Sequence, residues 1–394
     1  MTHAAAPDHA SAAAPAAPAD RPRGAYLHVP FCPHVCPYCD FHKMRRNENL
    51  VARYLDRLDG EIAAAGARWP GPLDTIYLGG GTPSHLSDAE LARVAAALDR
   101  AFGMPARLET TLEADPRTFD AARLARFRAL GFTRLSIGLQ STQDAVLRFL
   151  GRQHDAREGL AAVGAALEAG FEVSADLITA VPGQDAVQDL EALAATGVPH
   201  ASVYTLTVEP YTPFALRRVH VDEDRAAEDY ARAAAVLGAH GYRRYEVSNH
   251  ARPGFEAVHN QLYWHGDAFL GFGPSAAAYL PSDDGLGQRV TQPPIKAWLR
   301  GDPPERERLD PREYVLERLM TGLRTARGVD LDEVQARSGI DVRARWRGVV
   351  SEERRAGRLE LREAEPGHGR GATLRATPEG LMVLDGILRR LFAS

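Results

Sequence analysis

The sequence predicts an α/β protein: a partial barrel of six strand–helix units, (β/α)6, followed by a small helical domain that resembles a winged helix. Six short apolar runs rich in β-branched residues alternate with amphipathic stretches. Repeated strand–helix units favour a parallel sheet. Polar residues stand where several of these runs end, which is the edge at which parallel α/β barrels carry their chemistry.

The composition is that of an ordinary globular protein. The chain has 394 residues, 45% hydrophobic and 25% charged, with a formal net charge of −5. This length allows one large domain and a smaller one, and so mild a charge favours no nucleic-acid partner. No apolar run reaches the roughly 18 residues of a membrane span, so we do not expect an integral membrane protein. We expect residues 1–23, rich in Ala and Pro, to be a disordered extension and not a signal peptide.

The six expected strands all lie between residues 25 and 207. They are residues 25–29, 75–80, 109–114, 134–140, 173–180 and 200–207. Helical patterns separate them, and the pattern at 121–131 ends in Gly131, a residue suited to a helix C-terminus. We expect the barrel to span residues 24–281.

A different organisation is expected after the barrel. Residues 282–310 are rich in Gly, Pro and charge, which predicts an irregular linker. Amphipathic patterns at 312–325, 330–339 and 377–392, with an expected strand at 358–363, predict a C-terminal domain over 311–394. Winged helices often bind DNA, but the absence of a dense basic face favours a capping or docking role here.

All cysteines of the protein stand in one eight-residue stretch, namely Cys32, Cys36 and Cys39. An odd number so closely spaced is a poor disulfide framework and indicates a reducing compartment, so we expect a cytoplasmic protein. Thiolates bind zinc, copper(I) or iron–sulfur clusters. The C-x3-C-x2-C spacing fits a four-iron cluster with one iron open to a small ligand. The alternative is zinc bound by the three cysteines and one of His28, His34 or His42.

The segment "YLHVPFCPHVCPYCDF" (26–41) resembles the signature of the radical S-adenosylmethionine (SAM) superfamily, specifically its coproporphyrinogen-dehydrogenase-like branch. The resemblance covers roughly residues 24–394. It implies a partial (β/α)6 radical SAM barrel, a [4Fe–4S] cluster on the three cysteines, and SAM on the open iron. In that superfamily, electron transfer to SAM gives a 5′-deoxyadenosyl radical.

The same resemblance implies SAM contacts at successive strand ends. They are Tyr26, Tyr38, Gly80, Gly81, Thr82, Glu113, Gln140, Arg152 and Asp176. Each alone would be unremarkable, because a glycine-rich turn commonly just closes a strand–helix connection and a Tyr in an apolar strand is usually core. Their order along the chain is what the family pattern predicts.

Two stretches distinguish between branches of the superfamily. The oxygen-independent coproporphyrinogen III dehydrogenases carry a further cysteine two residues after the third ligand, where this chain has Phe41. Residues 245–280 instead resemble the heme-chaperone family HemW. Its H-N-x-x-Y-W motif is matched by His259, Asn260, Tyr263 and Trp264. Neutral imidazole is a common axial ligand of heme iron, although the same four side chains could simply hold a loop through hydrogen bonds.

One stretch departs from the family pattern: in Ser275–Ala278 a glycine and a histidine are replaced. His259 is then the main heme-ligand candidate, with His250 and His265 nearby. We therefore expect a heme chaperone that binds heme, a [4Fe–4S] cluster and SAM, and passes heme to membrane-associated respiratory proteins. The alternative is a radical SAM enzyme, either of the coproporphyrinogen III dehydrogenase type or a divergent methylase or cyclopropanase.

Overall fold

The computed structural model describes residues 21–103, 109–363 and 371–393. Its main sheet has 12 strands in the order β14-β13-β12-β11-β1-β4-β5-β6-β7-β8-β10-β9. The centre of this sheet consists of six parallel strands, namely β1 (Gly24–Val29), β4 (Thr75–Gly80), β5 (Glu109–Ala114), β6 (Arg134–Gln140), β7 (Glu172–Thr179) and β8 (His200–Thr205). These are the six expected strands, and the predicted fold class is confirmed.

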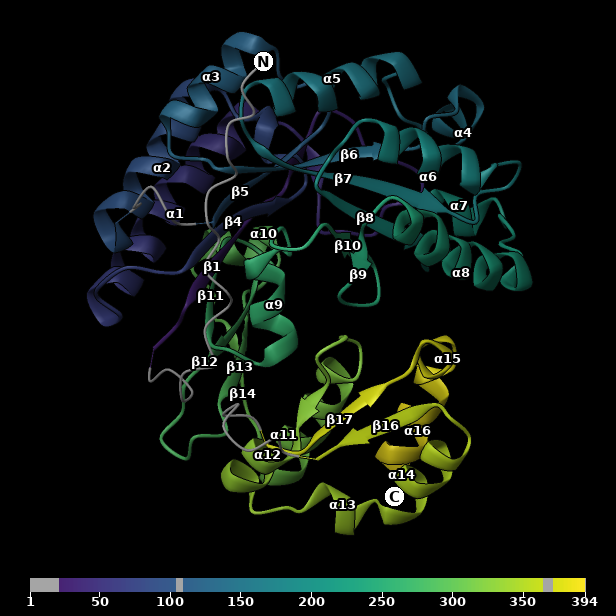
Figure 1. Cartoon of the computed structure of the whole chain (residues 1–394). Helices are drawn as coiled ribbons and strands as arrows, with labels where there is room; N and C mark the ends of the chain where they lie inside the picture. The colour runs from purple at the N-terminus through teal and green to yellow at the C-terminus, as the bar shows by residue number, and fades with distance from the viewer. Residues whose placement is uncertain (1–20, 104–108, 364–370, 394) are drawn as a thin grey trace, which may run out of the picture.

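Helices connect these strands and cover the outer face of the curved sheet (Figure 1). They are α1 (Glu48–Arg68), α2 (Asp88–Phe102), α3 (Ala121–Ala129), α4 (Asp144–Phe149), α5 (Ala156–Glu168), α6 (Ala186–Ala195), α7 (Pro213–Leu216) and α8 (Glu223–Ala239). Ser87 and Asp155 begin α2 and α5 with capping boxes. Gly131 follows α3 with φ +92°, as expected for a helix C-terminus.

The two faces of the parallel strands differ in polarity. Side chains that alternate toward the helices are buried and apolar, such as Leu27, Ile76 and Leu135. Side chains on the inner face include hydrogen-bonded polar groups such as Ser136 and Ser174. Successive residues of a strand point to opposite faces of the sheet. The alternation of apolar and polar residues along these strands therefore gives an apolar core on the helix side and a polar interior on the other side.

The prediction of an irregular linker at 282–310 was wrong. This stretch contains β13 (Gln288–Thr291), α10 (Ile295–Arg300) and β14 (Glu305–Arg308). The two strands pair antiparallel and extend the sheet beyond β11 (Phe269–Phe272) and β12 (Ala277–Leu280). Its glycines occupy tight turns between these elements, as at Gly285 and Gly287, which both have positive φ. The Gly and Pro content therefore marked short connections between paired strands.

The N-terminal boundary also differs from the expectation. Residues 1–20 of the expected disordered extension lie outside the described residues. Residues 21–23 belong to the fold, because the backbone N–H of Arg23 donates to the carbonyl of Ala268 at 2.8 Å. The Arg23 guanidinium also pairs with Asp74 and Asp267.

The C-terminal part has its own core around Trp346 and Leu374. Its helices are α11 (Pro311–Gly322), α12 (Leu331–Ser338), α13 (Val342–Arg345), α14 (Arg347–Arg355), α15 (Pro378–Met382) and α16 (Leu384–Ala393). A small antiparallel sheet in the order β15 (Val329–Asp330), β17 (Thr373–Ala376), β16 (Leu359–Arg362) completes the expected winged-helix-like arrangement. The pattern expected at 377–392 is divided into two helices at Val383.

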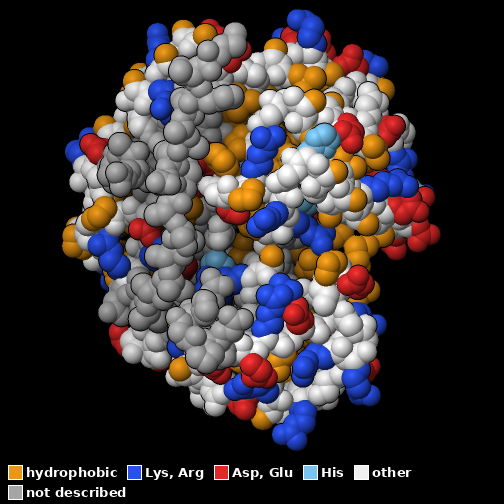
Figure 2. All heavy atoms as spheres, viewed as in Figure 1, with side chains coloured by type: hydrophobic (Ala, Val, Ile, Leu, Met, Phe, Trp, Pro, Cys, Tyr) orange, Lys and Arg blue, Asp and Glu red, His pale blue; other side chains and the backbone are white. Residues whose placement is uncertain are grey.

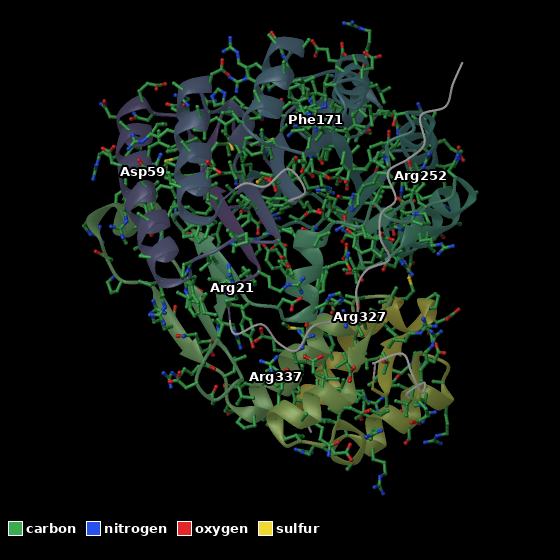
Figure 3. The ribbon with its side chains drawn as sticks, turned by 60° about the vertical axis from the view of Figure 1, so that its left-hand side comes forward. Arg21, Asp59, Phe171, Arg252, Arg327 and Arg337 are labelled. Atoms are coloured by element: carbon green, nitrogen blue, oxygen red, sulfur yellow. The ribbon has the colours of Figure 1, made fainter. Side chains whose placement is uncertain are left out.

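The C-terminal part meets the barrel at α9 (Val258–His265), which lies between the sheet and the C-terminal helices in Figure 1. Arg318 of α11 occupies the space beside Gly266, just after α9. Arg327, labelled in Figure 3 at this junction, has its Nη1 3.2 Å from Nδ1 of His265. On the face shown in Figure 2, Lys and Arg side chains gather around a hollow between the two parts. Within the described ranges, every helix is too short or too polar to span a lipid bilayer.

Candidate functional site

The cysteine loop follows β1 at the C-terminal edge of the parallel strands. β2 (Phe31–Cys32) and β3 (Met44–Arg45) pair in parallel and close the base of the loop. The loop presents the three predicted ligands as free thiols, with Cys32 and Cys36 buried and Cys39 half-buried. Nζ of Lys43 donates to the carbonyl oxygen of Cys39 at 2.5 Å, which fixes the far end of the loop.

Two side chains direct nitrogen atoms at Cys36. Nε2 of His34 lies 3.3 Å from the Cys36 Sγ, and Nη1 of Arg152 donates to the same sulfur at 3.7 Å. Burial raises the pKa of the Cys36 thiol, but the bond with His34 and the charge of Arg152 together outweigh burial and lower that pKa. Burial raises the pKa of Cys32 to about 11 and also raises the pKa of Cys39. Cys36 is therefore the thiol of the three that ionises most readily.

The donor set fits an iron–sulfur cluster, since three free thiols stand on one loop, the Arg152 guanidinium contacts one of them, Cys36, and the chain has no other cysteine. Of the histidines considered for zinc, His34 is the one beside a cysteine. Nε2 of His28 is 2.7 Å from the carbonyl oxygen of His42, and Nε2 of His42 accepts from the N–H of Ile295. Across 21–103, 109–363 and 371–393, no three His, Cys, Asp or Glu side chains form a group that could hold a single metal ion.

The glycine turn after β4 lies against the start of the cysteine loop. The N–H of Gly81 donates to the carbonyl of Val29 at 2.8 Å, and the N–H of Thr82 donates to that of Phe31 at 2.9 Å. A Cβ at Gly81 would come within 2.8 to 3.0 Å of backbone atoms of residues 29–31. Only glycine permits this approach, so the predicted glycine motif has a structural reason at this position.

Glu113, at the end of β5, joins the glycine turn to the barrel interior. Its Oε2 accepts from the N–H of Gly80 at 2.9 Å, and its Oε1 accepts from the Tyr77 hydroxyl at 2.8 Å. Burial raises the pKa of Glu113 to about 7 in spite of these bonds. Asp176 on β7 accepts from the Ser136 hydroxyl at 3.1 Å, and burial raises its pKa to about 6. Two buried carboxyl groups of this kind suit a ligand that brings a positive charge.

Arg152 lies between the cysteine loop and the strand ends. Its Nη2 donates to the Asp115 carboxylate at 2.7 Å and to the carbonyl of Gly138 at 2.9 Å, and the side chains of this ion pair are only 9% and 8% exposed. Sequence reasoning missed Asp115, although it stands two residues after Glu113 in the same "LEADP" stretch. Gln140 ends β6 with φ +66°, and a Cβ at Gly138 would lie 2.8 Å from its Nε2.

Of the two predicted tyrosines, Tyr26 stands on β1 before the cysteine loop, and Tyr38 stands within the loop between Cys36 and Cys39. Tyr26 stacks on Tyr77 with 6.0 Å between ring centroids, and its hydroxyl is 3.0 Å from Nδ1 of His28. Tyr38 packs on Phe214 at 6.3 Å. Burial raises the pKa of both predicted tyrosines, so both hydroxyls stay neutral. Their contact with SAM stays a prediction.

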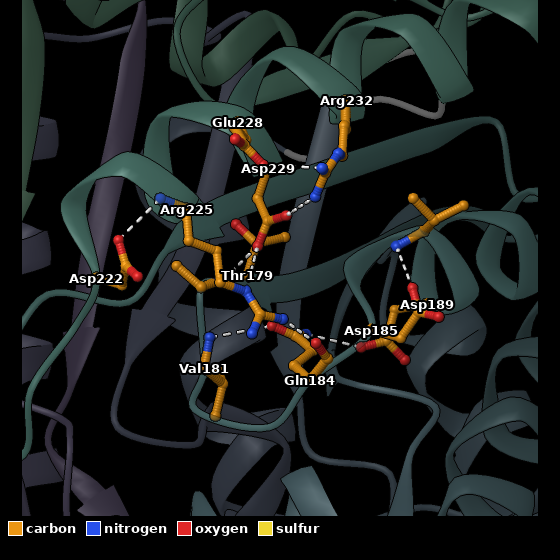
Figure 4. A network of polar contacts seen from close by, with 12 residues as sticks. Thr179, Val181, Gln184, Asp185, Asp189, Asp222, Arg225, Glu228, Asp229 and Arg232 are labelled. Atoms are coloured by element: carbon orange, nitrogen blue, oxygen red, sulfur yellow. Dashed lines mark hydrogen bonds and ion pairs between the residues drawn. The ribbon is translucent and has the colours of Figure 1, made fainter.

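A network of polar contacts ties the turn after β7 to α8, at the same edge as the cysteine loop, and Figure 4 shows its members Gln184, Asp189 and Arg225. Arg225 of α8 pairs with Asp229 and donates to the carbonyl oxygen of Gln184. Nε2 of Gln184 donates to the Asp189 carboxylate at 2.7 Å. That carboxylate also accepts from the hydroxyl of Ser141, directly after β6, at 2.7 Å. The network therefore fixes the backbone that carries Gln140.

The H-N-x-x-Y-W motif lies at the opposite edge of the sheet from the cysteines. The motif forms α9, and the N–H groups of Val258 and His259 donate to the Glu109 carboxylate at 2.6 and 2.9 Å. Nδ1 of His259 is 2.7 Å from Oγ1 of Thr75. Glu109 and Thr75 are the first residues of β5 and β4. Since parallel strands all begin at one edge, α9 covers the N-terminal edge of the barrel.

His259 is only 1% exposed, and both of its ring nitrogens have partners, Thr75 and the Tyr263 hydroxyl. Its ring stacks on Tyr77 with 5.1 Å between centroids and 20° between planes. Burial lowers the pKa of His259 to about 3, so the imidazole is neutral. Asn260, Tyr263 and Trp264 are half-buried on the same helix. The structure thus brings the four motif residues onto one helix. There, His259 makes hydrogen bonds that hold α9 to β4, which is the structural alternative to heme ligation named in the sequence analysis.

The remaining histidines of this region are separate from His259. His250 is buried in β10 (Asn249–Ala251), which pairs with β8, and His265 ends α9 beside Arg327. Ser275 takes φ +60°, the left-handed conformation that favours glycine. This is the stretch in which the family pattern has a glycine that this chain lacks.

Comparison with known proteins relates both parts of the chain to one group. Residues 26–197 match the family model of the Radical SAM superfamily, and residues 309–383 match that of the HemN C-terminal domain. A relative from Synechocystis, named Heme chaperone HemW, is 35% identical over 333 residues, which is 78% of this chain and 79% of that protein. The Heme chaperone HemW of Bacillus subtilis is 34% identical over 78% of this chain and 84% of its own.

A solved structure has the same fold. Coproporphyrinogen III oxidase (HemN) from Escherichia coli, described as a radical SAM enzyme, superposes with a TM-score of 0.79. The match covers 95% of this chain and 91% of that one at 22% identity. At 22% identity, this similarity establishes the fold and not the activity.

Proposed function

Because the chain belongs to the HemW family of radical SAM proteins, we propose that it is a heme chaperone that also binds a [4Fe–4S] cluster and SAM. The observation that carries this proposal is the similarity to relatives named heme chaperones over more than three quarters of the chain. Membrane-associated respiratory proteins are the proposed acceptors of the heme, and the cytoplasm is the proposed location.

In this proposal, Cys32, Cys36 and Cys39 hold the cluster at the C-terminal edge of the strands. The cluster, when bound, supplies the electron that cleaves SAM in this superfamily. The side chains of Glu113 and Asp176 offer carboxyl groups to the SAM ammonium, and Arg152 offers a guanidinium to its carboxylate. Gly80, Gly81, Thr82, Gln140, Tyr26 and Tyr38 complete the proposed pocket.

His259 is the proposed heme ligand at the other edge of the barrel. Its neutral imidazole has a lone pair for iron, but Nε2 is now hydrogen-bonded to the Tyr263 hydroxyl. If Tyr263 turns away, Nε2 is free to bind iron while Nδ1 keeps its bond to Thr75. A second hydrogen bond of this kind orients most metal-binding histidines.

The test is a heme titration followed by absorbance. Wild-type protein should shift the Soret band of heme, and His259→Ala should weaken binding at least tenfold. His240→Ala is the matched control, because His240 is an exposed histidine directly after α8, paired with Glu191, and its loss should leave heme binding unchanged. An unaltered titration in His259→Ala would remove the ligand assignment.

The polar C-terminal edge is also what a radical SAM enzyme needs, so a second assay separates the two functions. Cluster-loaded, reduced protein is incubated with SAM and coproporphyrinogen III, and tetrapyrroles are analysed. We expect no turnover to protoporphyrinogen. Rapid formation of protoporphyrinogen would replace the chaperone proposal with the dehydrogenase.

A further inference from the structure

Tyr77 contacts groups from both edges of the barrel. It is the third residue of β4, and its ring stacks on the His259 imidazole at 5.1 Å between centroids. Its hydroxyl donates to Oε1 of Glu113 at 2.8 Å, and the other Glu113 oxygen accepts from the N–H of Gly80. A continuous series of side-chain contacts therefore leads from α9 to the glycine turn.

This series of contacts runs along the length of β4. Thr75, the partner of His259, and Gly80, the partner of Glu113, are the first and last residues of β4. With a rise of about 3.3 Å per residue, they lie about 17 Å apart. The His259 imidazole and the Glu113 carboxylate lie closer together than the two ends of β4, because the Tyr77 side chain contacts both of them.

We propose that Tyr77 is a positioning residue that couples heme binding at His259 to SAM binding at Glu113, so that each ligand tightens the binding of the other. This inference rests on the proposed function, since it takes heme and SAM as the ligands of the two edges.

The direction of the coupling follows from the contacts. The ammonium group of SAM favours the ionised form of Glu113, and an ionised carboxylate accepts the Tyr77 hydroxyl more strongly than a neutral acid does. A firmly held Tyr77 ring fixes the plane of the imidazole stacked on it. His259 then loses less freedom when it binds iron, which favours heme binding. By linkage, heme must tighten SAM by the same factor.

The experiment measures heme affinity by Soret titration of anaerobic, cluster-loaded full-length protein, with and without SAM. No reductant is added, so that SAM stays intact. We expect SAM to tighten heme binding at least fivefold, or about 1 kcal/mol, and heme to tighten SAM by the same factor in the reciprocal titration. In Tyr77→Phe, which keeps the ring and loses the hydroxyl, both factors should fall to less than twofold while each ligand still binds alone.

Tyr242→Phe is the matched control. Tyr242 is a buried tyrosine whose hydroxyl donates to the backbone carbonyl of Val198, away from α9 and from Glu113. This variant should keep the full coupling factor, whereas a general loosening of the fold would lower it in both variants. Circular dichroism checks that both variants are folded.

The outcomes separate the inference from the proposed function. Heme binding that is unchanged by SAM in the wild type would overturn the inference and leave the heme chaperone standing. Full coupling in Tyr77→Phe would also overturn it, because the hydroxyl would then not transmit the effect. Absence of heme binding to the wild type would instead overturn the proposed function.

Discussion

SAM affinity should depend on pH through Glu113. The side chain is buried between Tyr77 and Gly80, and burial raises its pKa to about 7. The free protein therefore keeps this acid largely protonated below pH 7. A SAM ammonium beside it favours the carboxylate, so binding below pH 7 requires Glu113 to release its proton. The affinity should thus rise as pH rises through 7 and level off above it.

The size of the effect follows from the fraction of Glu113 that is ionised. If the carboxylate is the form that binds, about one eleventh of the protein is competent at pH 6 and about ten elevenths at pH 8, a change of about tenfold. Asp176, the other carboxyl group facing the interior, has a pKa raised by burial to about 6. Its titration adds about twofold over the same range.

Isothermal titration calorimetry of cluster-loaded protein at pH 6, 7 and 8 measures this directly. Buffers of different ionisation enthalpy should also reveal about 1.4 protons released per SAM bound at pH 6, about 0.9 from Glu113 and about 0.5 from Asp176. Glu113→Gln removes the titrating group and keeps an oxygen that accepts from the Tyr77 hydroxyl. In this variant, SAM affinity should change only about twofold between pH 6 and pH 8, through Asp176. Equal SAM affinity of the wild type at pH 6 and pH 8 would refute the reasoning.

Three further predictions concern the residues that hold the site together. Gly81→Ala places a Cβ within 3.0 Å of backbone atoms of the cysteine loop, so reconstituted protein should lose most of its iron, whereas Gly60→Ala, with open space on α1, should keep it. Asp115→Ala leaves the Arg152 guanidinium buried without its carboxylate, and should destabilise the protein by roughly 3 kcal/mol; an unchanged urea midpoint would contradict this. Glu109→Gln weakens the cap of α9 by about 1 kcal/mol, so amide exchange at the start of α9 should quicken roughly fivefold.

The sequence predicts best what depends on local periodicity. The six parallel strands follow from apolar, β-branched runs, and Glu113 and Gln140 lie at or next to the ends of β5 and β6, as expected. Asp176 was also expected at a strand end, but it is the fifth of the eight residues of β7. Strands β13 and β14 were missed because four-residue antiparallel segments between turns have too few residues to show a period.

Contacts between distant segments were beyond sequence reasoning. His259 and Thr75 are 184 positions apart, and nothing in either local pattern indicates that α9 covers the N-terminal edge of the strands. Tyr77 was not singled out from the sequence for the same reason, since its contacts with His259 and Glu113 depend on the fold. Asp115 could have been found, because it stands two residues after Glu113 and just past the end of the same strand. Its role as the partner of Arg152 still required the fold.

The placement of the two candidate sites on one strand limits how they can communicate. β4 is paired in register with β1 on one side and β5 on the other. A shift of its backbone in response to a movement of α9 would break the hydrogen bonds to both neighbouring strands. Its outward side chains, Ile76 and Leu78, are fully buried in the core and equally fixed. The inward side chains are therefore the ones free to respond. Among them, Tyr77 contacts both His259 and Glu113. If SAM binds at Glu113 and heme at His259, as proposed, this tyrosine would make the affinity for heme depend on whether SAM is bound.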